Sequence, residues 1–129
     1  MSAEDYLASL KGLIVAHPFV SQLAIVREEA QEALGLFRAR LILQDRSLLE
    51  LFEHFETGEE VVEVTKYSYH WQDETGRLRR RWDNAPHYPE LSTSPHHVHV
   101  GPGDRVQPHA QLSLQEVLDF ISAAFEGDT

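Results

Sequence analysis

The chain contains no cysteine, which excludes disulfide bonds and thiolate ligands for a metal. No apolar run approaches the roughly 18 residues of a membrane span, and the start lacks the basic and apolar stretches of a signal peptide. Basic residues are scarce, since 11 Lys and Arg stand against 21 Asp and Glu for a net charge of −10. These absences predict a soluble cytoplasmic protein that does not bind the membrane, and they disfavour nonspecific nucleic-acid binding over the whole surface.

The remaining composition is that of an ordinary globular protein. With 129 residues, of which 42% are hydrophobic, the chain is predicted to fold as one domain, residues 1–129, around one core. The basic residues are unevenly spread, because four of the 11 lie together at Arg77, Arg79, Arg80 and Arg81. A local cationic face on an acidic body is therefore compatible with the sequence.

Two segments have the periodicity of amphipathic helices, residues 3–16 and residues 112–125. Each begins with a capping-box pattern, Ser2 with Asp5 and Ser113 with Glu116. Between them, alternating apolar residues predict an antiparallel meander with strands at 36–43, 47–56, 61–72 and 77–83. Residues 20–34 are ambiguous between strand and helix. The predicted fold class is α+β: an antiparallel meander sheet of four or five strands with N- and C-terminal helices packed on one face.

A histidine-rich segment, WDNAPHYPELSTSPHHVHVGPG, follows the last predicted strand at residues 82–103. It holds four of the eight histidines and four prolines, so it is predicted to be a long irregular loop, and such loops are often functional. Where its end is extended, His97 and His99 point to one side and His96 to the other. At roughly 3.3 Å per strand residue, His70 would lie over about 20 Å from His87 unless the loop folds back. We therefore expect a site on one side of the molecule, built mainly between Asp83 and His99.

One interpretation of this segment is acid–base cleavage of RNA without a metal. Two histidines can act as general base and general acid, and His87 with His97 is the preferred pair. The other catalytic candidates are polar neighbours of this pair and the strand histidine: Asp83, Asn84 and His70. The candidate substrate-binding residues are cations that share a strand face, for phosphate, and an aromatic for base stacking: Arg77, Arg79, Arg81 and Tyr69. Core packing is the more usual role for Tyr69, together with Tyr67 and Trp71.

A second interpretation is a divalent metal site, because imidazole and carboxylate ligands suit Zn²⁺, Mn²⁺, Fe²⁺ or Ni²⁺. Its candidate ligands are His96, His97, His99 and Asp83, with His87 as a substitute for the carboxylate. A third interpretation is structural: the histidines and the Asp-Asn pair tie an irregular loop to the sheet of a non-catalytic binding module. His17, His54 and His109 carry no functional signal.

Three motifs occur together in residues 67–99: Tyr-x-Tyr-His at 67–70, Asp-Asn-Ala-Pro-His at 83–87 and Pro-His-His-x-His at 95–99. In these motifs the chain resembles the TumE-type toxins, the toxin component of prokaryotic type II toxin–antitoxin pairs. The resemblance extends over about residues 34–122, with departures at Tyr88, Ser94 and Val98. It implies a toxin that a cognate antitoxin protein neutralises, with RNA as the expected target. It implies no particular cofactor, and the oligomeric state stays open.

Overall fold

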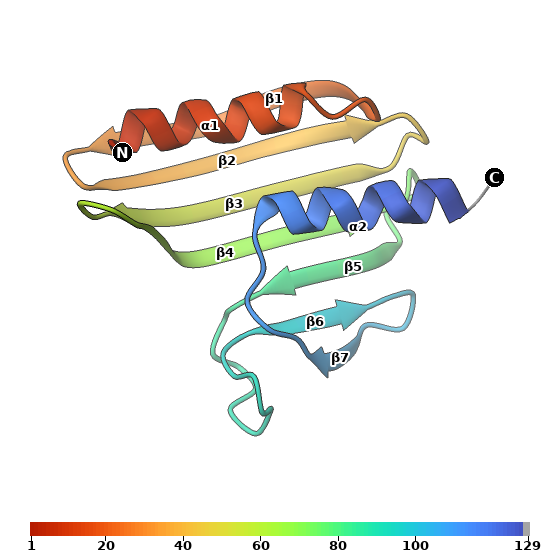
Figure 1. Ribbon diagram of the computed structural model, residues 1–129. Helices are drawn as coiled ribbons and strands as arrows, with labels where there is room; N and C mark the ends of the chain where they lie inside the picture. The colour runs from red at the N-terminus through yellow and green to blue at the C-terminus, as the bar shows by residue number, and fades with distance from the viewer. Residues whose placement is uncertain (128–129) are drawn as a thin grey trace.

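The computed structural model describes residues 1–127, which form one antiparallel sheet with two helices (Figure 1). The α+β class and the antiparallel meander are confirmed. The seven strands lie in chain order, so each one pairs with its neighbours in the sequence. Their bounds are β1 (Val20–Gln31), β2 (Leu34–Leu43), β3 (Leu48–Thr57), β4 (Val62–Gln72), β5 (Leu78–Asp83), β6 (His97–Val100) and β7 (Arg105–Pro108).

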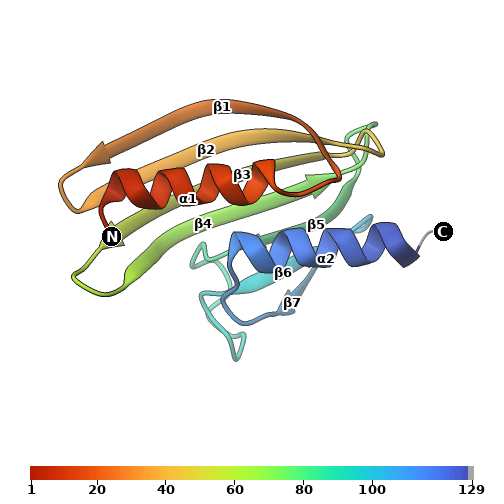
Figure 2. The ribbon, with the colours of Figure 1, turned by 45° about the horizontal axis from the view of Figure 1, so that its top comes forward.

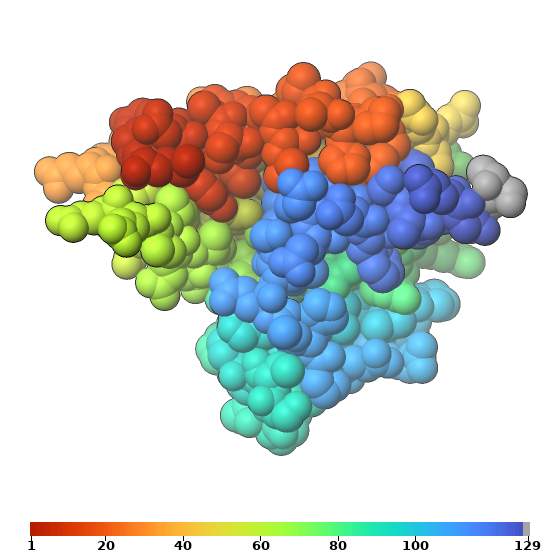
Figure 3. Space-filling model, viewed as in Figure 1, coloured from red at the N-terminus to blue at the C-terminus, as the bar shows by residue number. Residues whose placement is uncertain are grey.

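Both predicted helices are present and lie on the same face of the sheet (Figure 2). Helix α1 (Ala3–Val15) begins at the Ser2–Asp5 capping box, and helix α2 (Leu114–Gly127) begins after Ser113, which exchanges hydrogen bonds with Glu116. Together they cover much of the sheet, and the segment between β5 and β6 projects beyond them (Figure 3). Neither described helix is long and apolar enough to span a membrane.

The expected count of four or five strands is wrong. Residues 20–31 form strand β1 despite their Glu- and Ala-rich second half, because pairing with β2 outweighs the local helix preference. The segment predicted as one long loop contains strand β6, which forms a short hairpin with β7 just beyond it. Strand β6 pairs with β5, so the chain returns along the sheet after the loop.

The face beneath the helices forms the hydrophobic core. Alternate residues of the strands point into it, and Phe37, Leu41 and Trp82 are buried there with residues from both helices. The predicted aromatic row Tyr67, Tyr69 and Trp71 lies on the same side and is buried. These aromatics therefore serve core packing, the alternative that the sequence had left open.

The opposite face, here called the helix-free face, carries polar chemistry in two adjacent cross-strand rows. Residues paired directly across an antiparallel sheet share a face, so the register defines these rows. One row is Arg40, Glu50, His70, Arg81 and His99. The next row is Arg38, Phe52, Ser68, Asp83 and His97. The fold thus brings histidines and arginines from four strands, β2, β4, β5 and β6, onto one surface.

Candidate active site on the helix-free face

Asp83, at the end of β5, lies at the centre of the site. Its side chain is buried, and Oδ1 accepts a hydrogen bond from the Ala85 N–H at 3.0 Å. Arg81 Nε donates to Oδ2 at 3.1 Å. His97 Nε2 lies 3.0 Å from Oδ1, and His99 Nε2 lies 3.3 Å from Oδ2. The carboxylate thus contacts one cation and two imidazoles.

Strand β6 fixes the two imidazoles. Because His97 pairs with Asp83 across the sheet and the next residue but one is His99, both rings point to the helix-free face. His97 Nδ1 lies 2.9 Å from the Pro95 carbonyl oxygen, and His99 Nδ1 lies 2.7 Å from Asp104 Oδ1. Both partners are acceptors, so each Nδ1 carries the proton and each Nε2 is turned toward Asp83. The two Nε2 atoms are 3.1 Å apart.

A cavity of about 300 Å³ opens over this group. Four histidines, one arginine and two carboxylates line it together with two apolar residues. The lining residues are His70, Leu78, Arg81, Asp83, Ala85, His87, His97, His99 and Asp104. His87 is exposed at its rim, and the Tyr88 ring packs edge-on against His97 with ring centroids 4.9 Å apart. His87 and His97, the pair preferred from the sequence, therefore face one cavity.

His70 lines the same cavity, contrary to the expected separation from the loop histidines. It pairs with Arg81, and Arg81 pairs with His99, because β6 runs back along β5. The His70 Nε2–H donates to Gln72 Oε1 at 3.1 Å, while Nδ1 is buried without a hydrogen-bond partner in the described chain. This nitrogen retains its lone pair.

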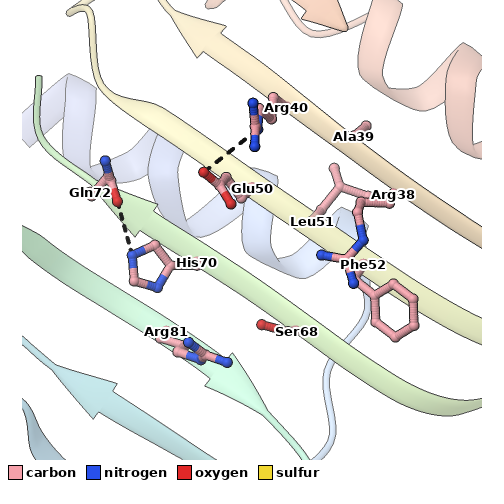
Figure 4. Close-up of a pocket in the computed structure, with 10 residues that line it drawn as sticks. All are labelled: Arg38, Ala39, Arg40, Glu50, Leu51, Phe52, Ser68, His70, Gln72 and Arg81. Carbon is pink, nitrogen blue, oxygen red and sulfur yellow. Dashed lines mark hydrogen bonds and ion pairs between the residues drawn. The ribbon is translucent and has the colours of Figure 1, made fainter. Parts of the chain in front are cut away.

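A second cavity, of about 260 Å³, adjoins the first on the helix-free face and shares His70 and Arg81 with it (Figure 4). Arg38 lies over the Phe52 ring at 4.6 Å, and Arg40 Nε lies 3.7 Å from Glu50 Oε1. Neither Arg38, Arg40 nor Phe52 was among the candidates from the sequence. The alternation of LFRARLIL already placed both arginines opposite the core, but only the cross-strand register joins them to the histidines.

Other candidates lie elsewhere. Asn84 ties the loop to β4, accepting from the Tyr67 N–H and donating to the Thr65 carbonyl, both at 3.0 Å. His96 Nδ1 pairs with the Tyr67 hydroxyl at 2.9 Å, and burial lowers the pKa of this histidine. The structural interpretation of the loop fits these two residues. Tyr69 is fully buried, and its hydroxyl donates to Glu53.

Of the three arginines expected to share a face, Arg81 alone reaches the histidines. Arg77 and Arg79 line a different cavity beside Trp71 and Phe120. Arg79 also binds Asp45 at 2.9 Å and lies 4.9 Å above the Trp71 ring. A register shift between Trp71 and Gln72 breaks the regular alternation on which the expectation rested.

This buried carboxylate among imidazoles, open to solvent on one side, has the groups for proton transfer, anion binding or metal binding. The chain is a member of a toxin family, because a family model for a toxin matches residues 10–125. That family is toxin TumE, and the chain belongs to it. No curated protein and no solved structure matches the chain.

Proposed function

We propose that this toxin cleaves RNA in the histidine cavity by acid–base catalysis. The observation that carries the proposal is the meeting of His70, His87 and Arg81 in one solvent-accessible cavity. A general base removes the proton of a ribose 2′-hydroxyl, whose oxygen attacks the adjacent phosphorus. A general acid protonates the departing 5′-oxygen, and the Arg81 guanidinium binds the phosphate charge.

His87 and His70 are the proton carriers that the geometry favours. His87 is exposed, and His70 lines the cavity with a half-buried ring that exchanges its proton through Nε2, because its Nδ1 is buried. His97, preferred from the sequence, is 2% exposed and has contacts at both ring nitrogens. We therefore assign His97 to the group around Asp83 that supports the cavity.

The second cavity supplies a path for the RNA strand. Arg38 and Arg40 can bind phosphates, and the Phe52 ring can stack on a base. A strand bound there continues to Arg81 and His70, which line both cavities. The substrate is single-stranded, since stacking on an aromatic side chain requires an unpaired base. The natural partner is a cognate antitoxin protein that neutralises the toxin by covering this face.

The purified protein should cleave single-stranded RNA and leave 2′,3′-cyclic phosphate ends. Activity should show a bell-shaped pH profile, because the base must start unprotonated and the acid protonated. His87→Ala and His70→Ala should each reduce the cleavage rate about 10²-fold or more. His54→Ala is the matched control, since His54 pairs with Thr65 outside the cavity. Growth inhibition that persists in His87→Ala, with no RNA cleaved by the wild type, would remove the proposal.

A further inference from the structure

We infer that Asp83, His97 and His99 form a binding site for one divalent transition-metal ion. The inference is drawn from the geometry of the three side chains. Any role of the ion in catalysis rests on the function proposed above. One ligand atom from each residue lies within 4.8 Å of the other two. The three side chains come from the paired strands β5 and β6, so a rigid part of the sheet holds them.

The distances match those between ligands of one ion. The two Nε2 atoms are 3.1 Å apart, and they lie 3.0 and 3.3 Å from the carboxylate oxygens. Two ligands that are each roughly 2.1 Å from an ion lie about 3 to 3.4 Å apart in octahedral or tetrahedral coordination. The three side chains are therefore already gathered closely enough for small adjustments to chelate one ion.

The orientation of the rings supports a metal over a set of ordinary hydrogen bonds. The Pro95 carbonyl and Asp104 fix the protons on the two Nδ1 atoms, so both Nε2 atoms present lone pairs. These two nitrogens are 3.1 Å apart and face the Asp83 carboxylate, so one cation can bind all three groups at once.

The donor set defines the class of ion. Two imidazoles and one carboxylate suit Zn²⁺ and the similar ions Mn²⁺, Fe²⁺, Co²⁺ and Ni²⁺. Arg81 occupies Asp83 Oδ2, which leaves Oδ1, oriented by the Ala85 N–H, as the oxygen best placed for the ion. Three protein ligands leave a coordination position for water or substrate, as in catalytic zinc sites.

His96 distinguishes a built site from a flexible histidine tag. It precedes His97 directly, but its ring stacks on Tyr67 and its Nδ1 pairs with the Tyr67 hydroxyl. A built site therefore excludes His96, whereas a flexible His-His-x-His chelator would use it. This difference provides a matched control within the same four residues.

The test is titration of the chelator-treated protein with Zn²⁺ by calorimetry, and with Co²⁺ by visible absorption. We expect one ion per chain, with affinity reduced at least 10-fold in Asp83→Asn, His97→Ala and His99→Ala but unchanged in His96→Ala. Asp104→Ala removes only the partner of His99 Nδ1 and should weaken binding about 10-fold or more. The Asp104→Ala variant keeps the test valid if a variant of one of the three ligands fails to fold. Circular dichroism will show whether each variant is folded.

Three results would overturn the inference: no binding to the wild type, binding that His99→Ala and Asp104→Ala leave unchanged, or an equal loss in His96→Ala. The last result identifies an adventitious chelator. These readouts do not use RNA. An absent metal leaves the cleavage proposal standing, and absent cleavage leaves the metal site standing, so the two failures are distinguishable.

Discussion

Adjacent residues in the central strands serve opposite faces of the sheet. Tyr69 is fully buried and donates to Glu53 in the core, whereas His70 lies on the helix-free face beside Arg81. The same alternation separates His96, which contacts Tyr67, from His97 in the site. Residues that pack in the core and residues that line the candidate site therefore alternate along the same strands.

Glu53 has a buried carboxyl group on the core side of strand β3. It accepts hydrogen bonds from the Tyr6 hydroxyl at 2.5 Å and the Tyr69 hydroxyl at 2.6 Å. Burial raises its pKa above the ordinary value of 4.5, although the two hydrogen bonds act in the opposite direction. The folded state therefore holds this proton more tightly than the unfolded state.

The raised pKa of Glu53 predicts how stability depends on pH. The contribution of this group is fully present below the ordinary pKa of 4.5 and is lost as pH rises through the raised folded pKa. Relative to Glu53→Gln, the wild type should therefore lose free energy of unfolding as pH increases above 4.5. Urea denaturation of both proteins across this range measures the difference. A difference that stays constant or increases with pH contradicts the assignment.

At the scale of the elements, the contact between β5 and the β6–β7 turn holds the site in register. The Gly101 N–H donates to the Arg79 carbonyl at 2.9 Å, and a Cβ at Gly101 would lie 1.7 Å from the Leu78 carbonyl oxygen. Only glycine permits this approach. The contact lies beside the pairing of Arg81 with His99, on which the cavity depends.

Gly101→Ala should therefore destabilise the protein by about 3 kcal/mol or more, since the clash is with backbone and cannot be relieved by rotating a side chain. The same variant should lose RNA cleavage, because the shift separates β5 from β6. Gly103→Ala is the control, as no atom lies within 4 Å of a Cβ there. Thermal and urea denaturation measure the effect, and equal stabilities of the two variants would show that the contact is dispensable.

The sequence predicted those elements whose signals are local. Capping boxes predicted both helices, and the alternation of apolar residues predicted strands β2–β5. Strand β6 was not predicted, because its four residues lie between prolines and are too few to show a period. Its position depends on pairing with β5. The same long-range pairing brings His70 to the loop histidines. The register shift at Gln72, which separates Arg79 from Arg81, has no signal in the sequence.

At the scale of the whole molecule, a net charge of −10 coexists with a face that carries several cations. Arg38, Arg40 and Arg81 lie on the helix-free face around the two cavities. If the protein acts on RNA as proposed, we expect the RNA to bind there despite the overall repulsion, because salt screens the distant acidic residues more than it weakens close contacts.

This arrangement predicts a specific salt dependence of RNA binding. Removing two phosphate contacts with Arg38→Gln and Arg40→Gln should reduce the slope of log affinity against log salt by about 1.4, at about 0.7 per contact to single-stranded RNA. Fluorescence anisotropy on the cleavage-deficient His87→Ala protein measures the slope. Arg46→Gln is the control, because Arg46 lies in the β2–β3 turn with its side chain 82% exposed. An equal change in the control would mean that overall charge governs binding.

Strand order along the sheet is also the order in which a ribosome makes the strands. A nascent chain can pair β1 through β5 as they emerge, but His97 and His99 come last and pair only with a completed β5. Prematurely terminated products that end before residue 97 therefore contain most of the sheet but lack His97, His99 and Asp104, which complete the lining of the cavity. If the cavity acts as proposed, its activity therefore requires the nearly finished polypeptide, and translation of incomplete chains would yield inactive fragments.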